Sequence, residues 1–297
     1  MRRLLNGIII SLLFFLLSVC GNERENVPDS KDALVDDLGV SFVFDNPPKR
    51  VISLAPSLTE MIYALDAYEA LVGNTLFCNY PPEAKEVEKV GDLLTFDYEK
   101  ILQLKPDLIF ISVEGNTKAA YDKFSELGLK IFVSNPRDYA GIKKSFRDIS
   151  HIFNKEEKAR KIISSWDSTI TSIKKRAANF KPQTVMFMVD LQPAYLAGRN
   201  TFINEMIEFC GMKNIAAESP LNYPVFNREE ILNRNPDYIF YSSDLKEDIN
   251  ILEIYPEWSE VNAIKNHNFI VVDRDLFSRP GPRYIEAIKV LSEKFEE

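Results

Sequence analysis

Histidine and cysteine, on which most metal sites and many catalytic sites depend, are scarce in this 297-residue chain. It holds only two histidines, His151 and His267, three cysteines and no Cys-x-x-Cys pair. The signatures Gly-x-Gly-x-x-Gly, Gly-x-x-x-x-Gly-Lys-Ser/Thr, Gly-x-Ser-x-Gly and His-Glu-x-x-His are also absent. We therefore expect no resident transition metal and no catalytic centre of these classes, and we interpret both histidines as solvated or capping residues near the ends of elements.

The apolar run at residues 8–17 is too short to span a bilayer comfortably, since a spanning helix needs about 20 such residues. It follows Arg2 and Arg3 and ends in Leu17-Ser-Val-Cys20, which is typical of a secretory signal. The closing Leu-x-x-Cys resembles a bacterial lipobox, with Val19 where Gly, Ala or Ser is usual. We predict a lipoprotein signal peptide at residues 1–20 that is lipidated on Cys20; an ordinary cleaved signal or an uncleaved anchor is the alternative.

The rest of the chain is expected to work outside the cytoplasm, after a flexible polar tether at residues 21–32. The formal charge is −8 at pH 7, and it becomes more negative when Arg2 and Arg3 leave with the signal. An acidic surface argues against nucleic acid and against anionic lipid as partners, so only the lipid anchor would touch the membrane. Cys78 and Cys210 fall in different halves of the chain, and we expect two unpaired, packed thiols.

A 12-residue stretch occurs twice, at residues 99–110 and again at residues 229–240, with seven identical positions. Each copy predicts a short helix, a Pro-Asp pair that ends it, and a buried strand, at residues 108–112 and 238–242. Further strands are predicted at residues 50–54, 130–134, 184–189 and 269–273, and Ser57-Leu-Thr-Glu60 has the pattern of a capping box that opens the first helix. Strands that alternate with helices predict two similar α/β lobes with largely parallel central sheets.

Residues 155–180 contain neither proline nor glycine and carry apolar side chains at helical spacing, and Pro182 follows them. We predict one long helix that joins an N-terminal lobe at residues 33–154 to a C-terminal lobe at residues 182–297, with residues 155–181 as the link. A stiff link of this kind predicts small opening and closing movements of the cleft between the lobes. A last helix is expected at residues 283–295.

The chain resembles the class III periplasmic solute-binding proteins, the cobalamin and iron-siderophore receptors of ABC importers, and within them the vitamin B12-binding branch. The similarity runs from about Arg50 to the C-terminus. The motifs that carry it are Arg50-Val-Ile-Ser-Leu-Ala-Pro-Ser-Leu-Thr-Glu60, Asn79-Tyr-Pro-Pro82, Tyr98-Glu-Lys-Ile-Leu-Gln-Leu-Lys-Pro-Asp107 and Ser278-Arg-Pro-Gly-Pro-Arg283. The family is non-enzymatic, with two α/β lobes bridged by a long helix.

The resemblance implies that Glu99 and Glu229, the first residues of the repeated stretch, dock against arginines of the permease dimer. Two carboxylates in equivalent places on two lobes would suit a partner with two-fold symmetry. The alternative is that each glutamate only favours the first turn of its helix.

The family's ligand-binding aromatic residues correspond here to Phe77, Tyr195 and Tyr223, with packing in the core as the alternative role. Two further wall positions that are tryptophan in B12-binding proteins are Leu93 and Ser112. A stiff loop with Asp275, Arg279 and Arg283 suits an anionic or amide-rich ligand, although Asp275 and Arg279 could form an internal ion pair instead.

The resemblance therefore predicts a monomeric lipoprotein that captures cobalamin or a related corrinoid as its transported ligand, with no resident cofactor. A ferric siderophore or haem receptor is the alternative among binding proteins. An extracytoplasmic enzyme built on similar lobes and a surface adhesion protein are hypotheses of other classes, and the sequence offers no nucleophile or metal cluster for the first.

Overall fold

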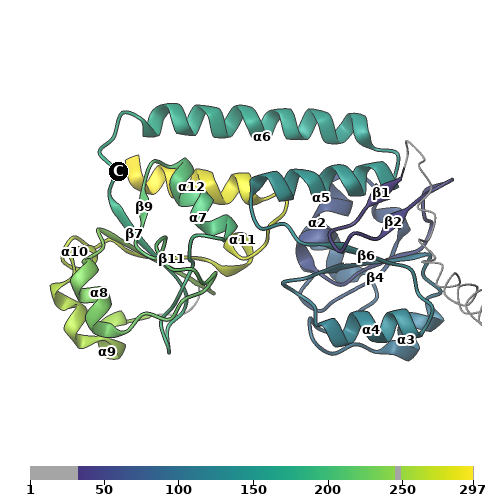
Figure 1. Ribbon diagram of the computed structural model, residues 1–297, viewed down its shortest axis with the longest axis horizontal. Coiled ribbons are helices and arrows are strands. Elements are labelled where there is room, and N and C mark those ends of the chain that lie inside the picture. The colour runs from purple at the N-terminus through teal and green to yellow at the C-terminus, as the bar shows by residue number, and fades with distance from the viewer. Residues whose placement is uncertain (1–32, 245–248, 297) are drawn as a thin grey trace, which may run out of the picture.

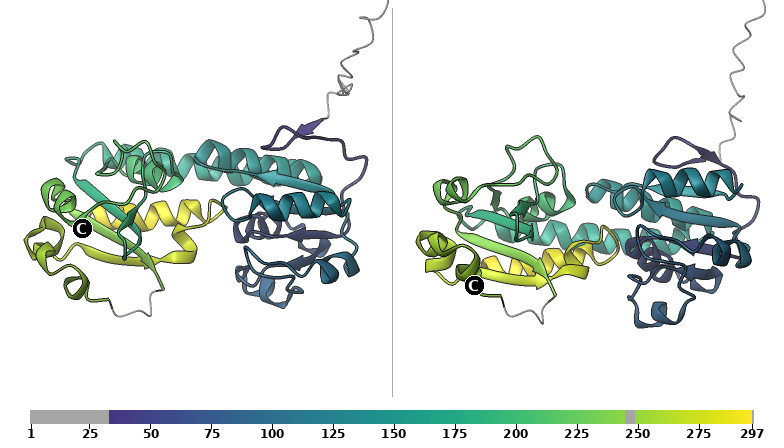
Figure 2. Two further views of the ribbon diagram at one scale, coloured as in Figure 1. Left: turned by 60° about the horizontal axis from the view of Figure 1, so that its bottom comes forward. Right: turned by 90° about the horizontal axis from the view of Figure 1, so that it is seen from below.

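The computed structural model describes residues 33–244 and 249–296. Two α/β lobes lie beside each other, and the long helix α6 (Glu156–Ala177) extends over both (Figure 1). The turned views also show the lobes as two separate bodies (Figure 2). No helix in this part of the chain is long and apolar enough to cross a membrane. The signal peptide, the tether and Cys20 lie outside the described residues.

The N-terminal lobe is built on a four-stranded parallel sheet of order β4-β3-β5-β6. Helices α2 and α5 cover the face toward α6, while α3 and α4 cover the other face (Figure 1). A short antiparallel hairpin, β1-β2, precedes the sheet. The elements are β1 (Leu34–Val35), β2 (Ser41–Phe42), β3 (Val51–Ser53), α2 (Pro56–Ala64), η1 (Tyr68–Ala70), β4 (Leu71–Asn74), η2 (Pro82–Glu86), α3 (Tyr98–Gln103), β5 (Leu108–Ser112), α4 (Lys118–Glu126), β6 (Ile131–Ser134) and α5 (Tyr139–Ile152).

The C-terminal lobe repeats this plan, because β9, β7, β10 and β11 pair in parallel in the same order as β4, β3, β5 and β6. The short strand β8 is added to it, antiparallel to β7. The elements are β7 (Thr184–Asp190), β8 (Tyr195–Leu196), α7 (Phe202–Phe209), β9 (Lys213–Asn214), α8 (Arg228–Arg234), β10 (Tyr238–Ser243), α9 (Ile251–Ile254), η3 (Pro256–Glu260), α10 (Asn262–Lys265), β11 (Phe269–Asp273), α11 (Arg274–Phe277) and α12 (Tyr284–Glu296).

The repeated Pro-Asp pair has the same structural role in both lobes. Asp107 Oδ2 accepts hydrogen bonds from the backbone N–H groups of Lys49 and Arg50, at the start of β3. Asp237 Oδ2 likewise accepts from the backbone N–H and the hydroxyl of Thr184, at the start of β7. The aspartate therefore fixes where the neighbouring central strand begins, which explains why the motif occurs once in each lobe.

Helix α6 carries the predicted apolar stripe, and the stripe connects the two lobes. Trp166 packs against Phe146 of α5 with ring centroids 4.9 Å apart, and α6 also contacts α12 and α7 of the C-terminal lobe. One continuous core therefore contains side chains from α2, α5, α6, α7 and α12. This shared core explains how a single helix can hold two lobes together.

The predicted capping box at the start of α2 is wrong. Ala55 is the N-cap residue, no side chain caps the helix, and Pro56 takes its first position. Proline suits this position because its missing N–H would have no partner there. Glu60 is thereby free for another role.

The other local predictions can be compared directly. Cys78 and Cys210 are buried and form no disulfide within the described residues, which confirms the expectation of two packed thiols. His151 lies in the last turn of α5, and its Nδ1 lies 3.0 Å from Glu156 Oε1. His267 follows α10 and has a left-handed backbone conformation.

Candidate functional site

A cavity of about 620 Å³ lies between the lobes, within the range of about 300–1,000 Å³ usual for small-molecule sites. The N-terminal lobe contributes the loops that follow its parallel strands, and the C-terminal lobe contributes the segment around α11 and the loop before α8. Such loops at the carboxyl ends of parallel strands are where α/β proteins place their ligands. The lining residues are Ala55, Pro56, Ser57, Phe77, Leu93, Ser112, Val113, Glu114, Gly115, Arg137, Asn222, Tyr223, Arg274, Asp275, Ser278, Arg279 and Pro280.

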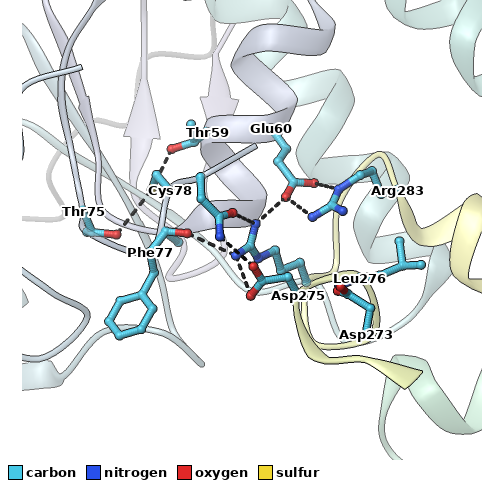
Figure 3. A network of polar contacts seen from close by, with 12 residues as sticks. Thr59, Glu60, Thr75, Phe77, Cys78, Asp273, Asp275, Leu276 and Arg283 are labelled. Atoms are coloured by element: carbon cyan, nitrogen blue, oxygen red, sulfur yellow. Dashed lines mark hydrogen bonds and ion pairs between the residues drawn. The ribbon is translucent and has the colours of Figure 1, made fainter. Parts of the chain in front are cut away.

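Two of the three predicted aromatic residues line this cavity, one from each lobe. Phe77 follows β4, and its side chain is half exposed and points away from the nearby polar network (Figure 3). Tyr223 comes from the C-terminal lobe, and burial raises the pKa of its phenol, with the Glu114 carboxylate as a second cause. The phenol therefore stays protonated and can donate a hydrogen bond.

Tyr195 does not line the cavity. It lies in β8, where it pairs with Asp190 of β7 and bridges to Val225, and its side chain is exposed. The neighbouring Leu196 is fully buried, as the alternation of a strand requires.

A polar network joins the lobes at one side of the cavity (Figure 3). We call it the Glu60 network and define it as Glu60, Asn79, Asp275, Arg279 and Arg283. Arg279 Nη1 donates to Glu60 Oε1 at 2.9 Å and to Asn79 Oδ1 at 2.8 Å. Its Nη2 donates to the backbone oxygen of Phe77 at 3.1 Å and pairs with Asp275 Oδ1 at 2.7 Å. The internal Asp275–Arg279 pair, left open as an alternative by the sequence, is therefore present.

Arg283 lies outside the cavity. Its guanidinium binds Glu60 through two bonds, from Nε to Oε2 at 3.0 Å and from Nη2 to Oε1 at 2.7 Å, and it stacks over the Tyr80 ring at 4.1 Å. Burial would lower the pKa of Arg283, but the bonds to Glu60 raise it, so the group remains fully charged. It borders a second cavity of about 640 Å³ beneath α6.

Several polar residues of the cavity had no signal in the sequence. Glu114 and Arg137 come from the loops after β5 and β6, Asn222 from the loop before α8, and Arg274 from α11. Within residues 33–244 and 249–296, Arg137 and Arg274 form no ion pair. Their positions after predicted strands were the only available hint, because loops there gather at the same edge of a sheet.

Glu99 and Glu229 are each the second residue of a short helix, α3 and α8 respectively, and both side chains are exposed. The two helices lie far apart, one in each lobe, on the side of the molecule opposite α6 (Figure 1). In the described part of the chain neither carboxylate forms an ion pair. Both are therefore available to a partner that approaches from that side.

A family model described as a periplasmic binding protein matches residues 51–276. The chain belongs to this family. Its members are binding components of transport, which hold a small molecule outside the cytoplasm and are not enzymes. The predicted fold class, two α/β lobes with largely parallel sheets joined by a long helix, is confirmed.

Three proteins illustrate the range of similarity. An uncharacterized ABC transporter substrate-binding lipoprotein of Bacillus subtilis is 33% identical, covering 97% of this chain and 96% of the relative. The crystal structure of the periplasmic vitamin B12 binding protein of Vibrio cholerae is 28% identical with a TM-score of 0.75, covering 84% and 97% of the two chains. A possible iron-binding periplasmic solute-binding protein of Staphylococcus epidermidis is also 28% identical, with a TM-score of 0.75 and coverage of 85% and 100%.

Proposed function

We propose that this protein is the solute-binding lipoprotein of an ABC importer that captures cobalamin or a related corrinoid and delivers it to the permease. The main support is the inter-lobe cavity, which Phe77 and Tyr223 line from opposite lobes together with Asp275. Flat aromatic side chains contribute contact area to a rigid ring system at little cost in entropy. Asp275 can accept hydrogen bonds from the amides of a corrinoid.

Titration calorimetry with cyanocobalamin tests the ligand directly. We expect saturable binding, and replacement of Phe77 or Tyr223 by alanine should weaken it by about tenfold or more, since each truncation removes an aromatic ring from the wall of the cavity. Tyr195→Ala is the matched control, because it removes an exposed aromatic ring outside the cavity and should leave the affinity unchanged. Absence of heat and of any thermal shift at tens of micromolar cyanocobalamin would refute the assignment.

A ferric siderophore or haem is the second candidate. Arg137 and Arg274 in the cavity favour it, because guanidiniums without an ion pair among the described residues suit ligand carboxylates, and the relative described as possibly iron-binding is a further support. The absorbance spectrum of material purified from its native host separates the candidates, since corrinoid, haem and ferric siderophore absorb differently.

The exposed Glu99 and Glu229 are proposed to dock on the two permease subunits. The double variant Glu99→Ala, Glu229→Ala should bind ligand normally and lose uptake. The control is Glu156→Ala with Glu157→Ala, two carboxylates that also lie in the first turn of a helix but on the opposite side of the molecule. Loss of uptake only in the first variant supports docking, whereas normal uptake in both contradicts it.

Cys20 is proposed as the lipid anchor. Mass spectrometry of the mature N-terminus should find a lipid-modified cysteine, and Cys20→Ala should release the protein from the membrane fraction. An unmodified N-terminus after a different cleavage site would contradict the proposal.

A further inference from the structure

Glu60 lies in the middle of α2, in the N-terminal lobe, yet among the described residues its carboxylate forms hydrogen bonds and ion pairs only with the C-terminal lobe. Both oxygens are used, and the partners are the guanidiniums of Arg279 and Arg283. The Glu60 side chain is only 2% exposed, and that of Arg279 only 6%. A carboxylate so far from water needs such partners, because a buried charge is costly unless it is paired and hydrogen-bonded.

Arg279 has few donors left for a ligand. Its Nη1 and Nη2 groups already serve Glu60, Asn79, Asp275 and the backbone oxygen of Phe77. This guanidinium therefore acts within the protein, where it forms bonds to residues of both lobes.

Asp275 is the member of the network that remains available to the cavity. Arg279 pairs with its Oδ1 at 2.7 Å, and the Asn79 side-chain amide donates to its Oδ2 at 2.7 Å. Its side chain is still 42% exposed and lines the cavity. Its carboxylate is thus held in one orientation by one residue from each lobe.

The backbone of the two lobes is also in close contact beside the Glu60 network. Gly281, between the two arginines, passes so close to α2 that an added Cβ would lie 3.3 Å from the Ser57 backbone oxygen. A second carboxylate, half-buried, bridges the lobes in the opposite sense, since Glu205 of α7 accepts from the backbone N–H of Tyr139 at 2.5 Å. Of these two carboxylates, Glu60 is the one that binds a residue of the cavity wall, Arg279.

We propose that Glu60 is the positioning residue of the cleft: by holding Arg279 and Arg283 it fixes the width of the cleft and aims the Asp275 carboxylate at the ligand. The role in ligand recognition rests on the proposed function of the cavity, whereas the role in holding the lobes does not. Buried charge-assisted bonds suit this task because their geometry is narrow, and a buried ionic group can specify one arrangement of the parts it joins.

The test compares Glu60→Gln with the wild-type protein in two measurements. Spin labels at Lys118→Cys and Glu260→Cys, exposed positions in different lobes, report the inter-lobe distance in a Cys20→Ala background. The same proteins are titrated with cyanocobalamin. A glutamine keeps one acceptor oxygen, but it loses the negative charge and places an NH2 donor where Glu60 Oε2 accepts from Arg283 Nε. We therefore expect a broader distance distribution and an affinity about tenfold lower, the effect of one lost charge-assisted bond.

Asp36→Asn is the matched control. Asp36 is also a buried carboxylate, but its bonds to Leu38, Val40 and Val133 stay within the N-terminal lobe. It should lower the melting temperature while leaving the distance distribution and the affinity as in the wild type. If Glu60→Gln does not fold, the charge-balanced double variant Glu60→Gln, Arg283→Gln and the milder Asn79→Ala replace it, with the same expectations.

The outcomes separate the two proposals. A wild-type distance distribution and affinity in a folded Glu60→Gln protein would overturn the positioning role. If wild-type protein does not bind cyanocobalamin but Glu60→Gln broadens the distances, the cobalamin assignment fails while the inter-lobe role of Glu60 stands.

Discussion

Gly198 allows two parts of the C-terminal lobe to approach more closely than any side chain would permit. It follows β8, and its N–H donates to the backbone oxygen of Asn222 at 2.7 Å. A Cβ at this position would lie 2.4 Å from the Leu221 oxygen, 3.0 Å from the Asn222 oxygen and 3.1 Å from Pro224 Cδ. Because two of these atoms are backbone, Gly198→Ala cannot be accommodated by turning a side chain.

The size of the effect follows from these distances. Ordinary contact begins at 3.4 Å, so the segment that precedes Tyr223 must move by about 1 Å. Overpacking of this kind costs about 1–3 kcal/mol of stability. Since the displaced segment carries Tyr223 into the cavity, we also expect the affinity for the ligand to fall about tenfold, equal to about 1.4 kcal/mol.

Urea unfolding and calorimetric titration with cyanocobalamin measure the two effects separately. Gly115→Ala is the stability control, because Gly115 lines the same cavity but its added Cβ would meet only Ser112 and Ala55 side chains, at 3.8 and 3.9 Å. It should be neutral or slightly stabilising. Unfolding of Gly198→Ala at the same urea concentration as the wild type would contradict this prediction.

Two further predictions concern buried or anchoring carboxylates. Asp107→Ala and Asp237→Ala should each destabilise their lobe by about 1–3 kcal/mol in urea unfolding, since each removes two hydrogen bonds at the start of a central strand. The control Asp122→Ala, on the surface of α4, should cost under about 0.5 kcal/mol. Burial raises the pKa of Glu205 above its usual 4.5, although the hydrogen bond from the Tyr139 N–H opposes the rise. The stabilising contribution of Glu205 is therefore lost as the pH rises through its folded-state pKa. Glu205→Gln should make the free energy of unfolding fall less steeply between pH 4.5 and neutral, as measured by urea unfolding at each pH.

The elements that the sequence predicts well are those with an unbroken local signal. The strands at residues 108–112 and 269–273 have the same bounds in the structure. The first is buried along its whole length, as a continuous apolar run predicts, whereas the second is a half-buried edge strand whose apolar run is also unbroken up to Asp273. The repeated helix, Pro-Asp pair and strand are also found in both lobes. By contrast, β8 and β9 have two residues each, too few for any periodicity to indicate them.

A distant part of the chain can override a local pattern, or bind side chains to which the pattern assigned another role. Ser57 and Glu60 have the spacing of a capping box, but Pro56 starts the helix and the Glu60 carboxylate is taken by Arg279, which is 219 positions away. Arg279 and Arg283 have the composition of a ligand-binding loop, and the same tertiary contact occupies them. No local pattern can show that two guanidiniums of one lobe will bind the same carboxylate of the other.

The charges that remain in the cavity bear on the choice of ligand. Within the Glu60 network two carboxylates balance two guanidiniums, so Arg137 and Arg274, opposed by Glu114, supply the residual positive charge. Haem carries two carboxylates, whereas cyanocobalamin has no net charge. Removal of the positive charge of Arg137 and Arg274 should therefore change the affinities for the two ligands differently. Arg137→Gln with Arg274→Gln should weaken haem binding by more than tenfold and change cobalamin binding less, as measured by titration of each variant with both ligands. An equal loss of affinity for both ligands would mean that the two guanidiniums maintain the structure of the cavity and do not bind the carboxylates of a ligand.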